Sequence, residues 1–218
     1  AYFPWSEILS VLAIISMPIG IIVGIQQSSI KRMLAYSSFA HAGYMLLAMP
    51  VMSGDSIYAI MIYLVMYLFM NLGAFFVVIY VNDQIGGEEF SSFDGLGWKM
   101  PYVAIPMTLF MVALTGLPPT AGFIGKFYIF AAVIELGSRF YWLAFVGVIN
   151  SVISLYYYIR VVKHMYLMGE RSDEFINPTS KLVLGLLFVL AVPSFVFGWY
   201  FSPIADWVSR STIMFQGM

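Results

Sequence analysis

The sequence predicts an all-α, polytopic membrane protein with six transmembrane helices, one of them discontinuous near residues 116–121. Composition is the first reason: 61% of the residues are hydrophobic and 10% are charged, whereas soluble domains carry about a quarter charged residues. Six stretches without a charged side chain are each 20 or more residues long, and about 20 apolar residues span a bilayer as a helix. The stretches lack the alternation of membrane β-strands, so helices, which satisfy their own backbone hydrogen bonds in lipid, are expected.

The charge-free stretches place the crossings along the chain. In order, the expected crossings are residues 6–26, 33–52, 56–81, 101–134, 140–162 and 180–201. Two longer connections, residues 82–99 and 163–181, are polar, and the first carries the Gly and Asp signals of turns. Neither is long enough for a domain, so residues 1–218 are expected to form a single membrane domain.

The basic residues of the connections indicate the orientation, because Lys and Arg favour the cytoplasmic side. With the N-terminus outside, seven basic residues face the cytoplasm and two, Arg139 and Arg210, face the outside. The inner set is Lys31, Arg32, Lys99, Arg160, Lys163, Arg171 and Lys181. Six crossings then place the C-terminus on the outer side as well.

The fourth crossing contains a segment that does not suit one straight helix, "LTGLPPTAGFIGKFYIF" at residues 114–130. A continuous helix over residues 100–134 would be about 52 Å long, whereas the hydrocarbon core is about 30 Å thick. The sequence therefore predicts two half-helices, about 101–115 and 122–134, joined by an extended link. Such a link is expected to be enclosed by protein or to line a wet cavity.

Two adjacent prolines explain the break. Pro118 and Pro119 have no amide hydrogen, so the carbonyls of Leu114 and Thr115 lose their usual helical partners. Two flanking glycines permit non-helical dihedral angles: Gly116 and Gly122. The freed carbonyls, together with the hydroxyls of Thr115 and Thr120, are expected to hold water.

Lys126 follows the break by about one helical turn. A charged residue within a membrane indicates a functional site, and discontinuous helices mark ion sites in transporters. A buried lysine changes its protonation state readily, as a proton carrier must. The alternative is a lysine that snorkels or forms a structural ion pair, with prolines that only kink the helix.

The second crossing begins "SSIKRMLAYSSFAHAGYML", in which Ser37, Ser38 and His41 share one helical face. His41 is a candidate for proton exchange, and a helix–helix contact is the equally weighted alternative. For the serines we favour packing, because small and hydroxylated residues support close helix contacts. Asn71 either packs or lines a water path, and Lys31 is most simply a basic anchor at the membrane surface.

Several kinds of chemistry are excluded or have no support. The chain has no cysteine, which excludes disulfides, thiolate metal sites and thiol-ligated iron–sulfur clusters. Two histidines do not build a haem or zinc centre, no phosphate-binding loop or nucleophile–base arrangement occurs, and no basic cluster suggests nucleic acid. The start "AYFPWSEILS" has no basic n-region, so we expect a processed or cropped beginning and not a signal peptide.

Four segments together resemble a known family: "QSSIKRMLAYSSFAHAGYMLLA", "LFMNLGAFFVV", "LTGLPPTAGFIGKFYIF" and "SLYYYIRVV". In order and spacing they are similar to subunit N (mitochondrial subunit 2) of the proton-pumping NADH:quinone oxidoreductase, respiratory complex I. The broader family also includes Mrp-type cation/proton antiporters. The "GKF" after the break favours subunit N, because the M-type subunit typically has Glu at that position.

The resemblance implies two inverted repeats, each with one broken helix. This chain resembles only the last six helices, the second repeat plus a C-terminal helix, so we expect a fragment whose partner is the missing N-terminal half. By this resemblance Lys126 matches the lysine of the second broken helix, His41 matches the histidine after the "IKR" loop, and Lys31 belongs to that loop.

The resemblance also implies a function: protons move through a buried Lys/His/water axis, driven by redox chemistry elsewhere in the complex. The chain itself is expected to bind no flavin, iron–sulfur cluster, quinone or metal; those cofactors are expected in partner subunits. Its expected partners are the other membrane subunits, especially neighbouring antiporter-like ones, in a bacterial cytoplasmic or an organellar inner membrane. The alternatives are an Mrp-type cation/proton antiporter subunit and a structural scaffold with an inert polar axis.

Overall fold

The computed structural model describes residues 5–50, 53–135, 137–169, 175–176 and 180–212. Within these residues the regular secondary structure is helical; the helices are joined by turns and loops, with one isolated antiparallel bridge between Ser29 and Glu89. The predicted all-α class is confirmed. The α-helices are α1 (Trp5–Ile25), α2 (Ile30–Leu47), α3 (Gly54–Ile85), α4 (Leu96–Lys99), α5 (Pro101–Thr115), α6 (Ala121–Glu135), α7 (Tyr141–Leu167), α8 (Lys181–Val196) and α9 (Ser202–Thr212). Two 3-10 turns join them: η1 (Phe90–Phe93) and η2 (Ser138–Phe140).

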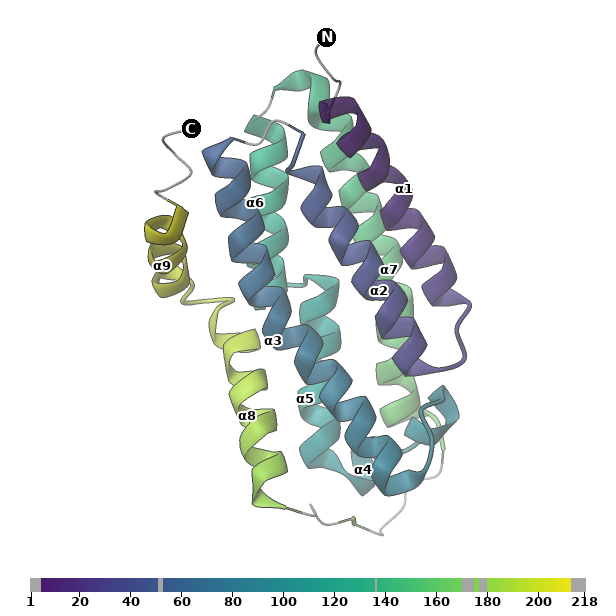
Figure 1. Ribbon diagram of the computed structural model, residues 1–218. Helices are drawn as coiled ribbons and strands as arrows, with labels where there is room; N and C mark the ends of the chain where they lie inside the picture. Colours follow the sequence, from purple (N-terminus) through teal and green to yellow (C-terminus); the bar gives the residue numbers. More distant parts are fainter. Residues whose placement is uncertain (1–4, 51–52, 136, 170–174, 177–179, 213–218) are drawn as a thin grey trace.

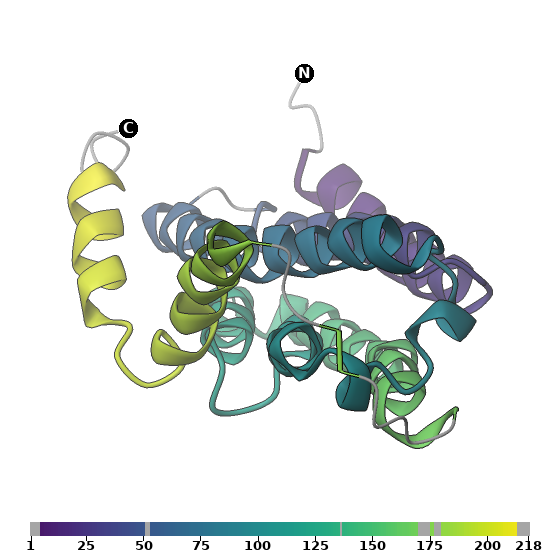
Figure 2. The same cartoon turned by 90° about the horizontal axis from the view of Figure 1, so that it is seen from below.

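The long helices form two layers (Figures 1 and 2). Helices α1, α2 and α3 make one layer, and α5, α6 and α7 make the other. Helix α8 packs against α3 and α5 at the edge, and α9 lies outside α8 near the C-terminus. The core between the layers is apolar; Met33, Phe110 and Val161 are fully buried there.

Large apolar side chains cover the outer surface, as expected of helices that face lipid. Phe145 and Val152 of α7, for example, are 66% and 65% exposed. Among the described residues, three helical segments are long and apolar enough to cross a membrane: Trp5–Ile25, Gly54–Ile85 and Ser138–Leu167. A bent pair, Phe90–Lys99 with Pro101–Thr115, would be a fourth. The count of six crossings stays a prediction.

The connection predicted as a polar loop at residues 82–99 is largely ordered and partly buried. Helix α3 continues to Ile85, and two short helical turns follow. Phe90, Phe93 and Leu96 enter the main apolar core. The predicted turn signals are at the turns, since Gly86 and Gly95 have left-handed backbone angles. The connection is less exposed than its polar composition indicates, because these three apolar side chains pack into the core.

The next connection also begins later than predicted. Helix α7 extends to Leu167, so His164, which the sequence places in a loop, is helical, and its Nδ1 lies 2.5 Å from Asp94 Oδ1. The rest of residues 163–181 lies partly outside the described residues. The last predicted crossing ends at Val196 rather than residue 201, and α9 follows as a separate amphipathic helix whose Ile204 and Val208 are buried.

Charged residues gather at the two ends of the helix bundle. At the end that carries the N-terminus, Arg139 pairs with Glu7 at 3.1 Å. At the opposite end, Lys31 pairs with Glu88 at 3.4 Å. Of the predicted inner set, Arg171 lies outside the described residues. Which end faces the cytoplasm stays a prediction.

Candidate functional site

The predicted break in the fourth crossing is confirmed. Helix α5 ends at Thr115 and α6 begins at Ala121 (Figure 1). Gly116 closes α5 in the left-handed region, with φ of +83°, a conformation that glycine adopts at low cost. The link spans residues 116–120, one residue shorter than predicted.

Gly122 has a different role from the predicted one. It lies inside α6, with no left-handed φ. A Cβ at this position would lie 1.8 Å from the carbonyl oxygen of Ala113. Glycine is therefore required for the close approach of α5 and α6, not for backbone freedom.

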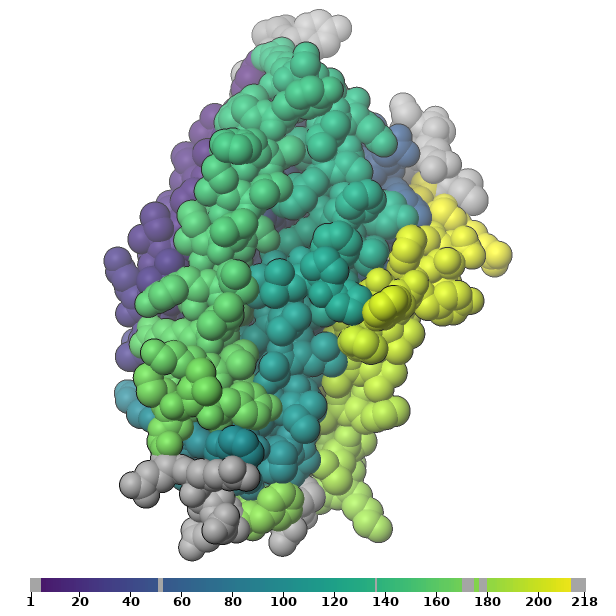
Figure 3. Space-filling model, turned by 180° about the vertical axis from the view of Figure 1, so that it is seen from behind, coloured from purple at the N-terminus to yellow at the C-terminus, as the bar shows by residue number. Residues whose placement is uncertain are grey.

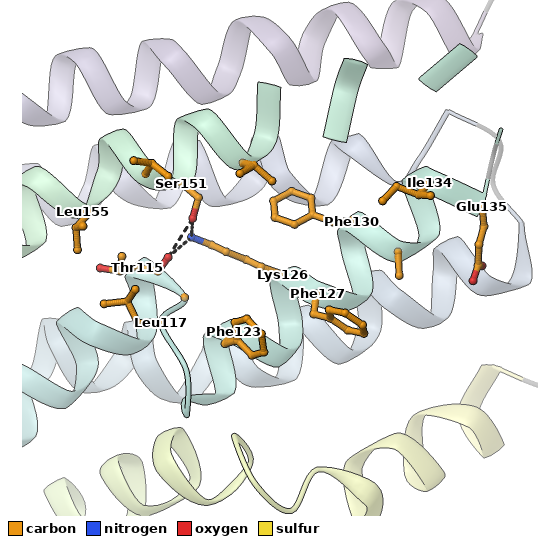
Figure 4. Close-up of a pocket in the computed structure, with 14 residues that line it drawn as sticks. Thr115, Leu117, Phe123, Lys126, Phe127, Phe130, Ile134, Glu135, Ser151 and Leu155 are labelled. Carbon is orange, nitrogen blue, oxygen red and sulfur yellow. Dashed lines mark hydrogen bonds between the residues drawn. The ribbon is translucent and has the colours of Figure 1, made fainter. Parts of the chain in front are cut away.

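Lys126 reaches back across the break to the end of α5. It is 4% exposed, and its Nζ donates to the carbonyl oxygen of Thr115 at 2.7 Å and to that of Leu114 at 3.2 Å. A third bond goes to Ser151 Oγ of α7 at 2.8 Å (Figure 4). The two carbonyls are the ones that the prolines leave without helical partners, and they form the negative end of the α5 dipole. The lysine thus caps one half-helix from the other.

The two threonine hydroxyls predicted to hold water bond to the backbone instead. Thr115 Oγ1 donates to the carbonyl of Met111 at 2.8 Å, and Thr120 Oγ1 donates to that of Leu117 at 2.7 Å. Their hydrogens are therefore used locally, and only oxygen lone pairs remain for another partner.

The chain encloses one side of the link. A Cβ on Gly198, in the turn after α8, would lie 2.3 Å from the carbonyl oxygen of Pro119, so the α8–α9 connection packs directly on the link. On the other side Leu117 is 40% exposed and Pro118 is also exposed. The described residues therefore enclose the link on one side only, whereas the sequence predicts a link that is enclosed by protein or lines a wet cavity.

A cavity of about 630 Å³ lies beside Lys126, between α6 and α7. It opens on the face that α5, α6 and α7 form (Figure 3). Its lining is mostly apolar and includes Phe123 and Phe127, with Lys126 and Ser151 at one end and Glu135 at the other (Figure 4). The cavity therefore extends from the lysine toward the C-terminal end of α6.

His41 is 1% exposed and is held by tyrosines from two other helices. Its Nδ1 lies 2.5 Å from Tyr63 Oη of α3, and its Nε2 lies 3.0 Å from Tyr158 Oη of α7. Tyr158 also bonds to Ser37. Tyr44 lies between His41 and Lys126: the centre of its ring is 5.9 Å from that of the His41 ring and 4.8 Å from Lys126 Nζ.

The remaining candidates lie apart from this centre. Ser38 donates to the carbonyl of Leu34 at 3.0 Å and to Asn71 Oδ1 at 3.4 Å, a contact between α2 and α3. Lys31 is ten residues before His41, about 15 Å along the helix, and its exposed side chain pairs with Glu88. The structure does not bring Lys31 to the other site residues.

Sequence reasoning missed four residues of the site: Ser151, Tyr44, Tyr63 and Tyr158. Ser151 could have been predicted, because Ser151 and Ser154 place two hydroxyl groups within a membrane helix, where hydroxyl groups need hydrogen-bond partners. The tyrosines gave no such signal because the chain has 15 of them.

These features define a polytopic α-helical membrane protein whose broken helix is capped by a buried lysine. The family model described as "NADH:quinone oxidoreductase/Mrp antiporter, TM" matches residues 1–154. The chain therefore belongs to the NADH:quinone oxidoreductase/Mrp antiporter membrane family, as the resemblance predicts.

Relatives by sequence carry the name of one subunit. The chain is 50% identical to NADH-quinone oxidoreductase subunit N 2 of Sorangium cellulosum, over 98% of this chain and 42% of the relative. It is 44% identical to the protein of the same name from Chloroherpeton thalassium, over 93% of this chain and 40% of that one. The chain thus spans less than half the length of these curated relatives.

Solved structures show the same architecture. Respiratory complex I of Thermus thermophilus contains a chain with a TM-score of 0.77 and 28% identity, matched over 92% of this chain and 45% of that one. A chain of the Dietzia Mrp complex matches with a TM-score of 0.81 over 95% of this chain and 47% of that one. Its identity is 17%, so this second likeness concerns the fold alone.

Proposed function

We propose that this chain carries protons as part of an antiporter-like membrane subunit of an NADH:quinone oxidoreductase. The observation that carries the proposal is the environment of Lys126: a buried amine held by three neutral acceptors across a helix break. Redox chemistry elsewhere in such an assembly would supply the energy.

Neutral acceptors distinguish a proton carrier from a structural ion pair. A lysine that served only structure would be expected to face a carboxylate, because an unpaired buried charge is costly. Among the described residues, no carboxylate forms an ion pair with Lys126. An ammonium group can donate to all three oxygens, and a neutral amine can donate to the two carbonyls and accept from the Ser151 hydroxyl. The site therefore suits both protonation states.

The cavity beside Lys126 supports a route away from it. The cavity extends from the lysine toward Glu135, at the end of α6. In the predicted orientation this is the outer side of the membrane. On the other side of the lysine, Tyr44 lies next to His41, whose imidazole ring is a second group that can carry a proton.

The proposal includes the rest of the expected picture. Residues 1–218 act as a single membrane domain, together with a missing N-terminal half that contributes its own half of the path. Flavin, iron–sulfur clusters and quinone belong to partner subunits, so this chain contributes to the enzyme without bond-making chemistry of its own. Neighbouring antiporter-like subunits are the proposed direct partners. The membrane is a bacterial cytoplasmic or an organellar inner membrane, with both termini outside.

The Mrp-type cation/proton antiporter remains the alternative, because the Mrp chain shares the fold. The relatives at 50% and 44% identity favour the oxidoreductase. Purification of the assembly that contains the chain distinguishes the two: redox subunits with an iron–sulfur signal support the oxidoreductase, and their absence supports the antiporter.

Substitution of Lys126 tests the proton-carrier role. Lys126→Met keeps much of the side-chain volume but holds no proton, and Lys126→Arg keeps a charge that is scarcely released. Both should reduce proton pumping by about a hundredfold or more, the usual range for loss of a proton-transfer group. The measurement is proton uptake by vesicles that hold the whole assembly, with subunit content checked.

Lys163→Met is the matched control, because Lys163 is an exposed lysine near the end of α7. It should pump as the unaltered assembly does. Rescue by Arg, with destabilisation by Met, would support a structural cation instead. Full pumping by both Lys126 variants would remove this residue from the pathway.

A further inference from the structure

The ring of His41 is part of a buried chain of hydroxyl groups that joins three helices. Both ring nitrogens have a tyrosine partner, Tyr63 at Nδ1 and Tyr158 at Nε2. All three side chains are 1% exposed or less. Neutral imidazole has one N–H and one bare nitrogen, so one tyrosine must donate to the ring while the other accepts from it.

The Tyr63 end of this chain of hydroxyl groups is closed. Among the described residues, Nδ1 of His41 is the hydrogen-bond partner found for the Tyr63 hydroxyl. If Nδ1 carried the proton, Tyr63 would have to accept it, and its own hydroxyl hydrogen would be buried without a partner. An unpaired buried donor is strongly disfavoured.

The Tyr158 end is open. Tyr158 bonds to Ser37 of α2, and the hydroxyl of the adjacent Tyr157 lies near those of Tyr158, Ser37 and Ser154. If Nε2 carries the proton, it donates a hydrogen bond to Tyr158, and Tyr158 donates its own hydrogen to Ser37. The hydroxyl of Ser37 can then donate to that of Tyr157. The polar hydrogens of the His41 ring, Tyr63 and Tyr158 then each have a partner.

We infer that Tyr63 is a positioning residue that holds His41 as the neutral Nε2–H tautomer, by donating its hydroxyl hydrogen to Nδ1. His41 can take a second proton only at Nδ1, so its protonation requires the Tyr63 hydroxyl to turn away. Tyr63 thereby restrains proton uptake by His41. This inference deepens the proposed function, since it rests on His41 as a member of the proton path.

The test is the ¹⁵N NMR spectrum of histidine in the labelled, membrane-embedded assembly, with the His41 signal identified by its absence in His41→Gln. The unaltered assembly should show the Nε2–H tautomer in excess by about fivefold or more, the ratio that an unpaired buried donor implies. Tyr63→Phe keeps the ring and removes the hydroxyl, and it should lower that ratio by about fivefold or more.

Tyr67→Phe is the matched control. The Tyr67 ring lies 4.9 Å from that of His41, but its hydroxyl is not the partner of either ring nitrogen. It should leave the tautomer ratio unchanged. A predominant Nδ1–H tautomer in the unaltered assembly would overturn the inference, even if Tyr63→Phe did not assemble; so would an unchanged ratio in Tyr63→Phe. The tautomer is read without pumping, so failure here is distinct from failure of the Lys126 experiment.

Discussion

Replacement of Gly122 by alanine tests whether the contact between the half-helices positions Lys126. The added Cβ would lie 1.8 Å from the carbonyl oxygen of Ala113, whereas ordinary van der Waals contact begins at 3.4 Å. Helices α5 and α6 must then separate by roughly 1.5 Å to relieve the overlap. Such a separation would stretch the 2.7 Å bond from Lys126 to Thr115 beyond hydrogen-bond length.

The magnitude follows from three contributions. Overpacking in a close-packed interior costs about 1–3 kcal/mol. Loss of a hydrogen bond to a charged group costs about 1.5–3 kcal/mol. Alanine has a higher helix propensity than glycine, which offsets up to about 1 kcal/mol of this destabilisation. The net destabilisation should be about 1.5–5 kcal/mol.

Gly185→Ala provides the matched control, because Gly185 is also helical and a Cβ there meets no atom within 4 Å. The assay heats the purified assembly and follows its dissociation, with proton pumping measured on the same preparations. Gly122→Ala should dissociate at a lower temperature and pump less, while Gly185→Ala should match or slightly exceed the unaltered assembly. Equal behaviour of the two variants would refute the role given to Gly122.

Two further predictions concern the topology and the covered side of the break. Cysteines introduced at Arg32 and at Arg139 should react with an impermeant reagent from opposite sides, because the bundle separates them and basic residues favour the cytoplasm; labelling of both from one side would contradict the orientation. Gly198→Ala places a Cβ 2.3 Å from the carbonyl oxygen of Pro119 and should destabilise the folded chain by about 1–3 kcal/mol. The measurement is the protease resistance of the membrane-embedded chain, which should fall. Resistance equal to that of Gly185→Ala would show that the contact is dispensable.

The sequence predicts the helical class and the break because both depend on local chemistry. Long apolar stretches have one stable backbone solution in lipid, and Pro118 and Pro119 remove amide hydrogens wherever they occur. The same logic identifies the carbonyls of Leu114 and Thr115 as unpartnered, and Lys126 as a residue in need of acceptors. The structure joins these two expectations in one set of hydrogen bonds.

The rest of the site depends on contacts between segments that are distant in the sequence, and local sequence patterns do not predict such contacts. Tyr63 and Tyr158 are separated from His41 by 22 and 117 residues. Nothing local distinguishes them from the other tyrosines of the chain. For Gly122 the local reading was wrong, since its small size serves a neighbouring helix rather than its own backbone.

The packing of Gly198 on the link has a consequence for the order in which the protein is made. Polypeptides are synthesised from the N-terminus, and the 79 residues from Thr120 to Gly198 take about 4–16 s to synthesise. The residues that accept hydrogen bonds from Lys126 are therefore synthesised before Gly198: Leu114, Thr115 and Ser151. The acceptors of Lys126 can therefore be in place before the α8–α9 connection covers Pro119.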